Sequence, residues 1–184
     1  EAIPVNLPHA RAQYWIGNKS KLSAEIRKVL LGEKGQPRSE ASEAQSDYSE
    51  LLHEQERFYQ EVFGLEKDFS KLKLPQDPGG FAWLIVMAEG LTLSQIWQKI
   101  EGRMPCWKYW DNLDEITSDR KTDKDYAIRV RDRIEADEEF RNKSAEDLKR
   151  EGISGITLFE RLLLELFYHW KTGGHLDLQN VTLC

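Results

Sequence analysis

The chain has few cysteines and no long apolar run, and these two absences exclude several classes of protein. Only Cys106 and Cys184 occur in the 184 residues, and they belong to no C-x-x-C pair. Two distant cysteines therefore fit reduced thiols in the cytoplasm better than a disulfide scaffold. The longest nearly uncharged apolar stretch, residues 81–88, is far shorter than the roughly 20 residues of a membrane helix. We expect no membrane span.

Sequence motifs of catalysis are also missing. The chain contains no G-x-S-x-G, no glycine-rich phosphate loop and no H-E-x-x-H. Its four histidines are scattered along the chain. His169 follows Glu165 by four residues, which is the spacing of an ordinary pair on a helix surface. We therefore expect no cofactor, and the sequence favours a role other than catalysis.

The composition is that of a folded globular protein. Hydrophobic residues make up 40% of the chain and charged residues 32%, with a net charge of −6. The length fits one domain with an appendage. An amphipathic helix follows Ser20 and stops at Gly32, and the next residues lack apolar periodicity. We predict a helical N-terminal arm (1–31), a flexible linker (32–46) and an α+β domain (47–184).

Strand and helix patterns alternate in the predicted domain. Residues 81–88 form a continuous apolar run, short enough for a buried strand. Thr92 with Gln95, and Thr157 with Glu160, have the spacing of capping boxes that open amphipathic helices. We predict an α+β fold with a small sheet of about four strands covered by two or three amphipathic helices. The strands are expected at 81–88, 106–110, 126–134 and 176–183, and the main helices at 92–101 and 157–171.

The sharpest local pattern lies in residues 126–134. Apolar residues occupy alternate positions, so a strand there would have one apolar face. The opposite face would present Arg129, Arg131 and Arg133. Guanidinium groups match the geometry of phosphates, so this row is a candidate binding face. The alternative is a solvated face or one paired with carboxylates.

Three nearby aromatic residues, Trp107, Tyr109 and Trp110, are candidate stacking surfaces for the bases of a nucleic acid. The surrounding segment 107–140 is acidic, however, with seven Lys/Arg against eleven Asp/Glu and a net charge of −4. Because nucleic-acid affinity depends on neutralising phosphates, this surround disfavours nucleic acid as a partner. The aromatic residues are expected in the core or at an interface instead.

A second alternative uses the acidic residues after the predicted strand. Asp132, Glu135 and Asp137 are hard oxygen ligands close together in the sequence, of the kind that hold Mg²⁺ or Ca²⁺. With Arg129 or Arg131 on a phosphate, they would form a nuclease-like site. Their spacing is not that of an EF-hand, and carboxylates after a strand also serve as partners of adjacent arginines.

The segment from Phe81 onward resembles a family of uncharacterised bacterial proteins, most clearly at DYAIRVRD (125–132) and GITLFERL (155–162). The resemblance covers about residues 81–184. The family has no assigned activity, so no functional residue is implied. Its members typically continue further, which implies that the domain is truncated at its C-terminus.

Aromatic content completes the functional prediction. Six Trp, six Tyr and seven Phe exceed the needs of one small core, and aromatic surfaces favour partner binding. A tethered helix can dock on a neighbouring copy. We predict a non-enzymatic protein-interaction module of a larger bacterial protein or assembly, able to self-associate. The alternative is a metal-dependent phosphodiester enzyme or a nucleic-acid-binding domain that uses the arginine face.

Overall fold

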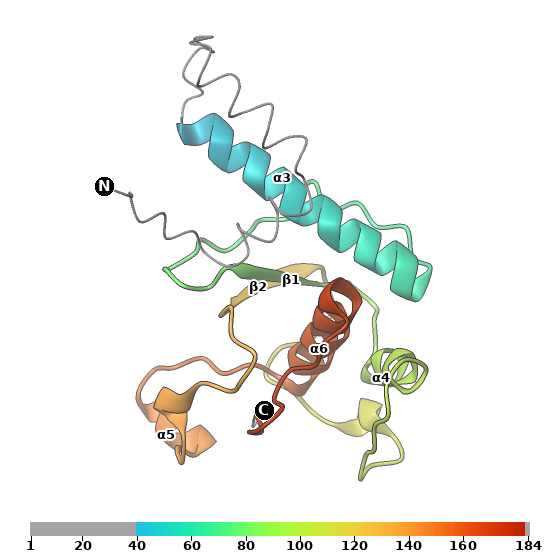
Figure 1. Ribbon diagram of the computed structural model, residues 1–184, viewed down its shortest axis with the longest axis vertical. Helices are drawn as coiled ribbons and strands as arrows, with labels where there is room; N and C mark the ends of the chain where they lie inside the picture. Colours follow the sequence, from blue (N-terminus) through green and yellow to red (C-terminus); the bar gives the residue numbers. More distant parts are fainter. Residues whose placement is uncertain (1–39, 183–184) are drawn as a thin grey trace, which may run out of the picture. The chain divides into compact units, whose positions relative to one another are not determined.

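The computed structural model describes residues 40–182 (Figure 1). By its contacts the chain divides into Glu1–Asp47 and Tyr48–Cys184, and the elements below belong to the second unit, apart from the first turns of helix α3 (Glu40–Phe58). The predicted arm 1–31 lies outside the described residues. Helix α3 begins inside the stretch 32–46 for which a flexible linker is predicted.

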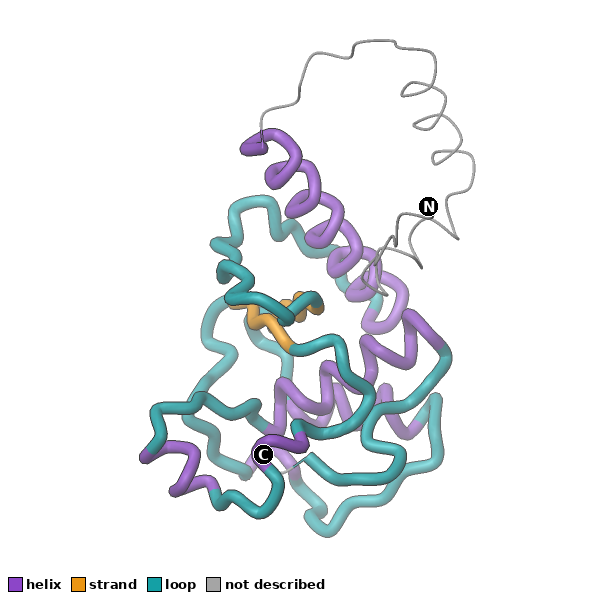
Figure 2. The backbone as a smooth tube through the Cα atoms, turned by 60° about the vertical axis from the view of Figure 1, so that its left-hand side comes forward, coloured by secondary structure: helices purple, strands orange, loops and turns teal. Residues whose placement is uncertain are grey.

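An antiparallel pair of strands, β1 (Trp83–Met87) and β2 (Tyr126–Val130), forms the centre of the fold. Trp83 lies opposite Val130 and Met87 opposite Tyr126. Within residues 40–182 the sheet has these two strands, so the predicted sheet of about four strands is wrong, although the fold is mixed α and β. Figure 2 shows how little of the domain is strand and how much is loop.

Two of the predicted strands, 106–110 and 176–183, are not formed in the described residues. Residues 106–110 form an exposed loop, and 176–182 consist of turns. Aromatic and β-branched residues favour strands only where a neighbouring strand and a buried face are present, and neither is present here. The backbone N–H of Asn180 instead donates to the Glu135 carboxylate at 3.0 Å.

The two main predicted helices are present with the predicted starts. Helix α4 (Leu93–Glu101) and helix α6 (Leu158–Thr172) both begin with the predicted capping boxes. A short helix, α5 (Ala145–Arg150), also begins with a capping box. Helix α6 packs against β1, with the Phe167 ring centre 5.7 Å from that of Trp83. The remaining elements are a π-helical turn Tyr59–Phe63, which continues α3, and 3₁₀ turns at Leu113–Glu115 and Glu138–Phe140.

The core surrounds β1. Leu84 is 2% exposed, and the next four residues are fully buried. In Figure 1 the strands lie between α6 and the C-terminal half of α3. Paired residues of the two strands point to the same face of the sheet, and so do alternate residues of one strand. Tyr126 pairs with Met87, so it lies on the same face as Trp83, toward α6. No helix among the described residues has the length and apolar character needed to cross a membrane.

Side chains from α3 and its π-helical continuation bond to the backbone of β1. The Gln55 amide donates to Leu84 O at 2.9 Å and accepts from Val86 N at 3.1 Å. The Tyr59 hydroxyl donates to Val86 O at 2.7 Å and accepts from Ala88 N at 3.0 Å. Backbone groups of consecutive residues point to opposite edges of a strand, and those of alternate residues point to the same edge. The bonded groups of Leu84, Val86 and Ala88 therefore lie on one edge of β1 and of the residue that follows it, the edge that faces away from β2. Two side chains thus take the place of a third strand.

Candidate protein-interaction site

Three of the most exposed large apolar side chains of the described region lie together on one loop. Trp107 is 68% exposed, Tyr109 81% and Trp110 62%. They belong to residues 105–112, which we call the aromatic loop and which follows α4. Aromatic rings are usually at least partly buried, and a contiguous exposed apolar patch marks an interaction site more often than a bare surface.

The aromatic loop is fixed at both ends. Met104, before it, and Leu113, after it, are buried at 8% and 4% exposure. The backbone N–H of Met104 donates to Ile100 O at 2.9 Å, which ties the first end to the last turn of α4. The Asp114 carboxylate accepts from Ser94 N at 2.9 Å, which ties the second end to the first turn of the same helix. One helix therefore holds both ends of the loop.

The Asp114 anchor is electrostatically favourable. Burial by itself would raise the pKa of this carboxyl, but hydrogen bonds from Ser94 and Thr92 outweigh burial and lower the pKa below its ordinary value. The carboxylate therefore stays charged near neutral pH, at the N-terminal end of α4, where the helix dipole favours negative charge.

Within the loop the three rings contact one another. The ring centres of Trp107 and Tyr109 are 4.0 Å apart at 69°, and those of Tyr109 and Trp110 are 6.4 Å apart at 77°. Lys108 closes the turn, with its amine donating to Asp111 O at 2.8 Å. The loop thus presents an aromatic cluster supported by its own backbone.

Cys106 lies in the same loop, exposed and free. Burial, and then the negative charge of Glu101, raise the pKa of its thiol. A raised pKa keeps the group protonated at neutral pH, whereas a nucleophilic cysteine needs a lowered pKa. The loop therefore supplies aromatic surface and no activated thiol.

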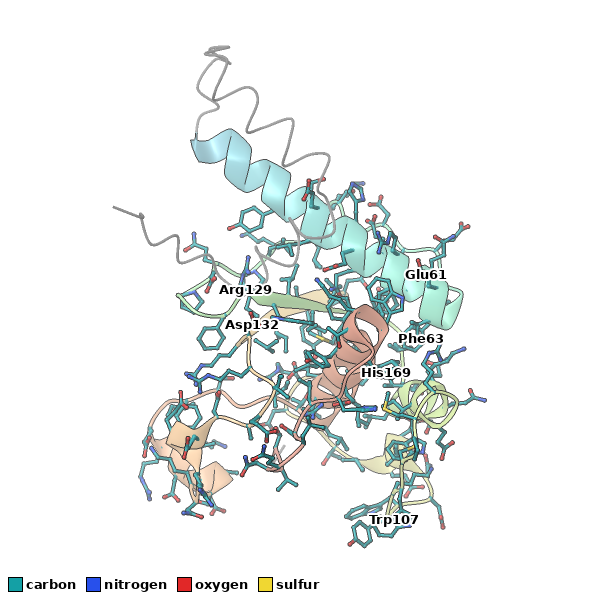
Figure 3. All side chains as sticks on the ribbon, in the orientation of Figure 1. Glu61, Phe63, Trp107, Arg129, Asp132 and His169 are labelled. Carbon is teal, nitrogen blue, oxygen red and sulfur yellow. The ribbon has the colours of Figure 1, made fainter. Side chains whose placement is uncertain are left out.

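The structure does not bring the aromatic residues to the predicted arginine face. Figure 3 places Trp107 at the end of the domain away from Arg129 and Asp132. Arg129 lies in β2, where its guanidinium donates to Pro75 O at 2.9 Å and Phe81 O at 3.4 Å. Its hydrogen bonds go to backbone carbonyls of the chain, which leaves fewer donors for a phosphate.

The other two arginines follow β2 and pair with two acidic residues. Arg131 contacts Asp137 at 2.8 Å and also bonds to Glu139. Arg133 contacts Asp137 at 3.1 Å and Glu139 at 2.6 Å. This arrangement is the carboxylate-paired alternative that the sequence left open. The charge of the arginines is largely neutralised within the domain.

The three acidic residues of the metal alternative have separate partners. Asp132 accepts from the Trp83 indole N–H at 2.8 Å, Glu135 accepts from Asn180 N at 3.0 Å, and Asp137 pairs with the two arginines. Among residues 40–182, no group of three His, Cys, Asp or Glu side chains is arranged to hold a metal ion. The geometry gives the nuclease-like alternative no support.

The paired charges predict a titration change. Hydrogen bonding from Arg133 is the main cause that lowers the pKa of Glu139 to about 2, and the charges of Arg131 and Arg133 lower it further. We expect Arg133→Ala to raise the Glu139 pKa toward its ordinary value near 4.3, because one positive partner is lost. An NMR pH titration of the Glu139 side chain measures the change. Arg150→Ala, at an exposed pair elsewhere, is the matched control, and a Glu139 pKa unchanged in Arg133→Ala would contradict the pairing.

A buried ionic cluster is the polar feature that sequence reasoning missed. Glu160 is fully buried and accepts from Arg120 at 2.6 and 2.5 Å, and from the Tyr126 hydroxyl at 3.0 Å. Arg120 lies forty residues earlier in the long connection before β2. The sequence predicts Glu160 as a capping residue, and the structure confirms this role, since Glu160 accepts from Thr157 N at 2.8 Å. No local spacing could reveal its second partner.

The cluster is a structural support. Burial would raise the pKa of Glu160, but the Arg120 hydrogen bonds and charge outweigh burial and lower the pKa. Burial, and then the Glu160 charge, raise the pKa of Tyr126. In the described region no buried side-chain polar atom lacks a partner. Every group of the cluster is therefore engaged, which suits a fixed contact between α6 and the connection before β2.

No protein family, curated protein or solved structure was found to match the chain. Function is therefore inferred from the side chains.

Proposed function

We propose that the chain is a non-enzymatic protein-interaction module that binds its partner through the aromatic loop. The observation that supports the proposal is the exposure of Trp107, Tyr109 and Trp110, by 62% to 81%, on one anchored loop. Tryptophan and tyrosine are enriched among the residues that dominate binding energy at interfaces. The arginines and carboxylates of the alternative sites are engaged with one another, whereas these rings are covered by no other part of the described chain.

The size of the loop fits the centre of an interface. A large aromatic side chain offers roughly 150–250 Å² of surface, so three rings at these exposures supply on the order of 400 Å², about half of what one partner buries in a typical interface. The anchors at Met104 and Leu113 fix the loop before binding, which lowers the entropy lost on association. Neighbouring surface would supply the rest of the contact.

The wider setting of the module belongs to the same proposal. A place within a larger bacterial protein or assembly, in the cytoplasm, is the setting that we propose for it. Self-association is one form that the interaction can take, with the aromatic loop of one copy on another.

The test is a triple variant, Trp107→Ala with Tyr109→Ala and Trp110→Ala. Light scattering over a concentration series measures self-association, and a panel of peptides of varied charge measures partner binding. We expect the triple variant to lose the association or the peptide binding that the unmodified chain shows. Its thermal stability should hardly change, because exposed substitutions usually alter the unfolding free energy by less than about 0.5 kcal/mol.

The matched control replaces three other exposed apolar residues, Ile134, Leu178 and Val181, with alanine. It should retain association and binding. If the aromatic triple variant binds as well as the unmodified chain, or if the unmodified chain is monomeric and binds no peptide, the proposal is wrong.

A further inference from the structure

We infer that the aromatic loop recognises a basic partner, namely an extended protein segment that carries Arg or Lys side chains. The inference rests on the proposed function, since it names the class of partner for the same loop. It comes from the charges that surround the rings and from the partners that those charges have.

The surround of the aromatic loop is acidic. Residues 101–116 contain four carboxylates and two basic residues, for a net charge of −2 within a chain whose net charge is −6. The carboxylates are Glu101, Asp111, Asp114 and Glu115, and the basic residues are Arg103 and Lys108. Such a field attracts cations and repels nucleic acid, acidic peptides and anionic surfaces.

Apart from Asp111, the carboxylates around the loop have neutral partners. Glu101 accepts from the Trp97 indole N–H at 2.5 Å, and Glu115 accepts from the Asn112 amide at 2.9 Å. Asp111 is exposed on the tip itself, beside Trp110. By contrast, the carboxylates of Asp137 and Glu139 are bound by arginines. The carboxylates at the end of β2 are thus neutralised by arginines, whereas those around the aromatic loop keep their negative charge available to a partner.

The two basic residues of the loop region donate to the chain's own carbonyls. Lys108 donates to Asp111 O at 2.8 Å, and Arg103 donates to Lys99 O at 3.1 Å. Neither is engaged with a carboxylate there. They hold the backbone and leave the acidic side chains to an outside cation.

Aromatic faces complement such a cation. Lys and Arg are attracted to the faces of Trp and Tyr within about 6 Å of the ring centre. The domain uses this contact internally, with the Arg131 guanidinium 5.0 Å from the Phe81 ring and the Lys171 amine 5.2 Å from the Trp83 ring. On the aromatic loop the rings are exposed and no described cation lies over them. A basic segment would place its cations on the rings and its remaining charge against the acidic surround.

Three labelled peptides of equal length test the inference by fluorescence anisotropy: one rich in Arg and Lys, one rich in Asp and Glu, and one of Ser and Gln. We expect the basic peptide to bind at least about tenfold more tightly than the neutral one at low salt. Binding should weaken strongly at high salt, because the attraction is electrostatic. The aromatic triple variant should lose it.

A charge variant, Asp111→Asn with Glu115→Gln, separates charge from aromatic contact. This variant should bind the basic peptide about three- to tenfold more weakly, and its unfolding free energy should be unchanged. The same change in charge on another surface, Glu138→Gln with Glu146→Gln, is the control and should have little effect.

The outcomes distinguish the inference from the proposed function. Loop-dependent binding of the neutral or acidic peptide with equal or greater affinity, or loop-dependent self-association that outcompetes the basic peptide, would overturn the basic partner and leave an interaction module. Basic-peptide binding that the aromatic triple variant retains would overturn both. Both would also be overturned if the unmodified chain stayed monomeric and bound no peptide at about 1 mM, because a weaker affinity is too low for recognition.

Discussion

Replacing Arg120 with alanine is expected to destabilise the domain by about 3 kcal/mol, the lower end of the range for breaking a buried ion pair. The lower end applies because the Arg120 side chain is 34% exposed while that of Glu160 is fully buried. Without Arg120, the carboxylate keeps hydrogen bonds from Tyr126 and Thr157 but loses its positive partner. Urea unfolding followed by circular dichroism measures the loss.

The pH dependence of this variant should reverse in sign. In the unmodified chain the folded pKa of Glu160 is lowered, so its contribution to stability is present above the unfolded pKa and is lost as pH falls through the folded pKa. In Arg120→Ala, burial dominates and raises the folded pKa. The variant should therefore recover part of its stability as pH falls from 7 toward the unfolded pKa, when Glu160 takes up a proton.

A double variant checks the assignment. Arg120→Ala with Glu160→Gln removes the charge along with its partner and should be more stable at pH 7 than Arg120→Ala alone. Arg150→Ala, which breaks an exposed pair with Asp147, should have little effect. If Arg120→Ala is no worse than Arg150→Ala, or if the double variant is no more stable, the cluster does not support the fold as described.

Removing the side-chain polar groups that bond to the backbone of β1 should also lower the stability of the domain strongly. Gln55→Leu keeps the size of the side chain but leaves Leu84 O and Val86 N without partners. Tyr59→Phe does the same to Val86 O and Ala88 N. Since each buried, unpaired backbone group costs about 1–3 kcal/mol and each variant leaves two, we expect each variant to lose about 2–6 kcal/mol of unfolding free energy.

Amide hydrogen exchange can test the Gln55 and Tyr59 bonds separately. The amide of Val86 should exchange faster in Gln55→Leu while that of Ala88 stays protected, and the reverse should hold in Tyr59→Phe. Gln98→Leu, on the exposed face of α4, is the control for replacing a glutamine. Equal protection of both amides in all variants would mean that the side chains do not close this edge of the strand.

Local patterns predicted the elements that depend on local interactions. The capping boxes at Thr92 and Thr157 start their helices as expected, because their hydrogen bonds join residues three positions apart. The apolar run at 81–88 forms the shorter strand β1 (Trp83–Met87), because a run of this length between glycines suits a strand buried on both faces. Strand β2 begins as predicted at Tyr126 but ends at Val130 instead of residue 134, because Val130 pairs with the first residue of β1 and no strand residue lies opposite the next positions.

Features that depend on distant partners could not be predicted. The aromatic residues at 107–110 have high strand propensity, but no strand lies beside them, so the same residues form the exposed loop. Trp107, Tyr109 and Trp110 were identified as candidate binding residues from their type, whereas their exposure depends on the anchors at Met104 and Leu113. The pairing of Arg120 with Glu160 and the bonds from Gln55 to β1 join segments far apart in sequence.

The way in which α3 meets β1 also bears on how the sequence can change over evolution. The bonds from Gln55 and Tyr59 reach only the main chain of the strand, and main-chain atoms are the same whatever side chain is attached. Leu84 and Val86 can therefore drift among apolar residues of similar volume without loss of these bonds. At Gln55 and Tyr59, by contrast, donor and acceptor must both be kept at a fixed reach. Purifying selection should thus act on polar identity in the helix and only on size and hydrophobicity in the strand.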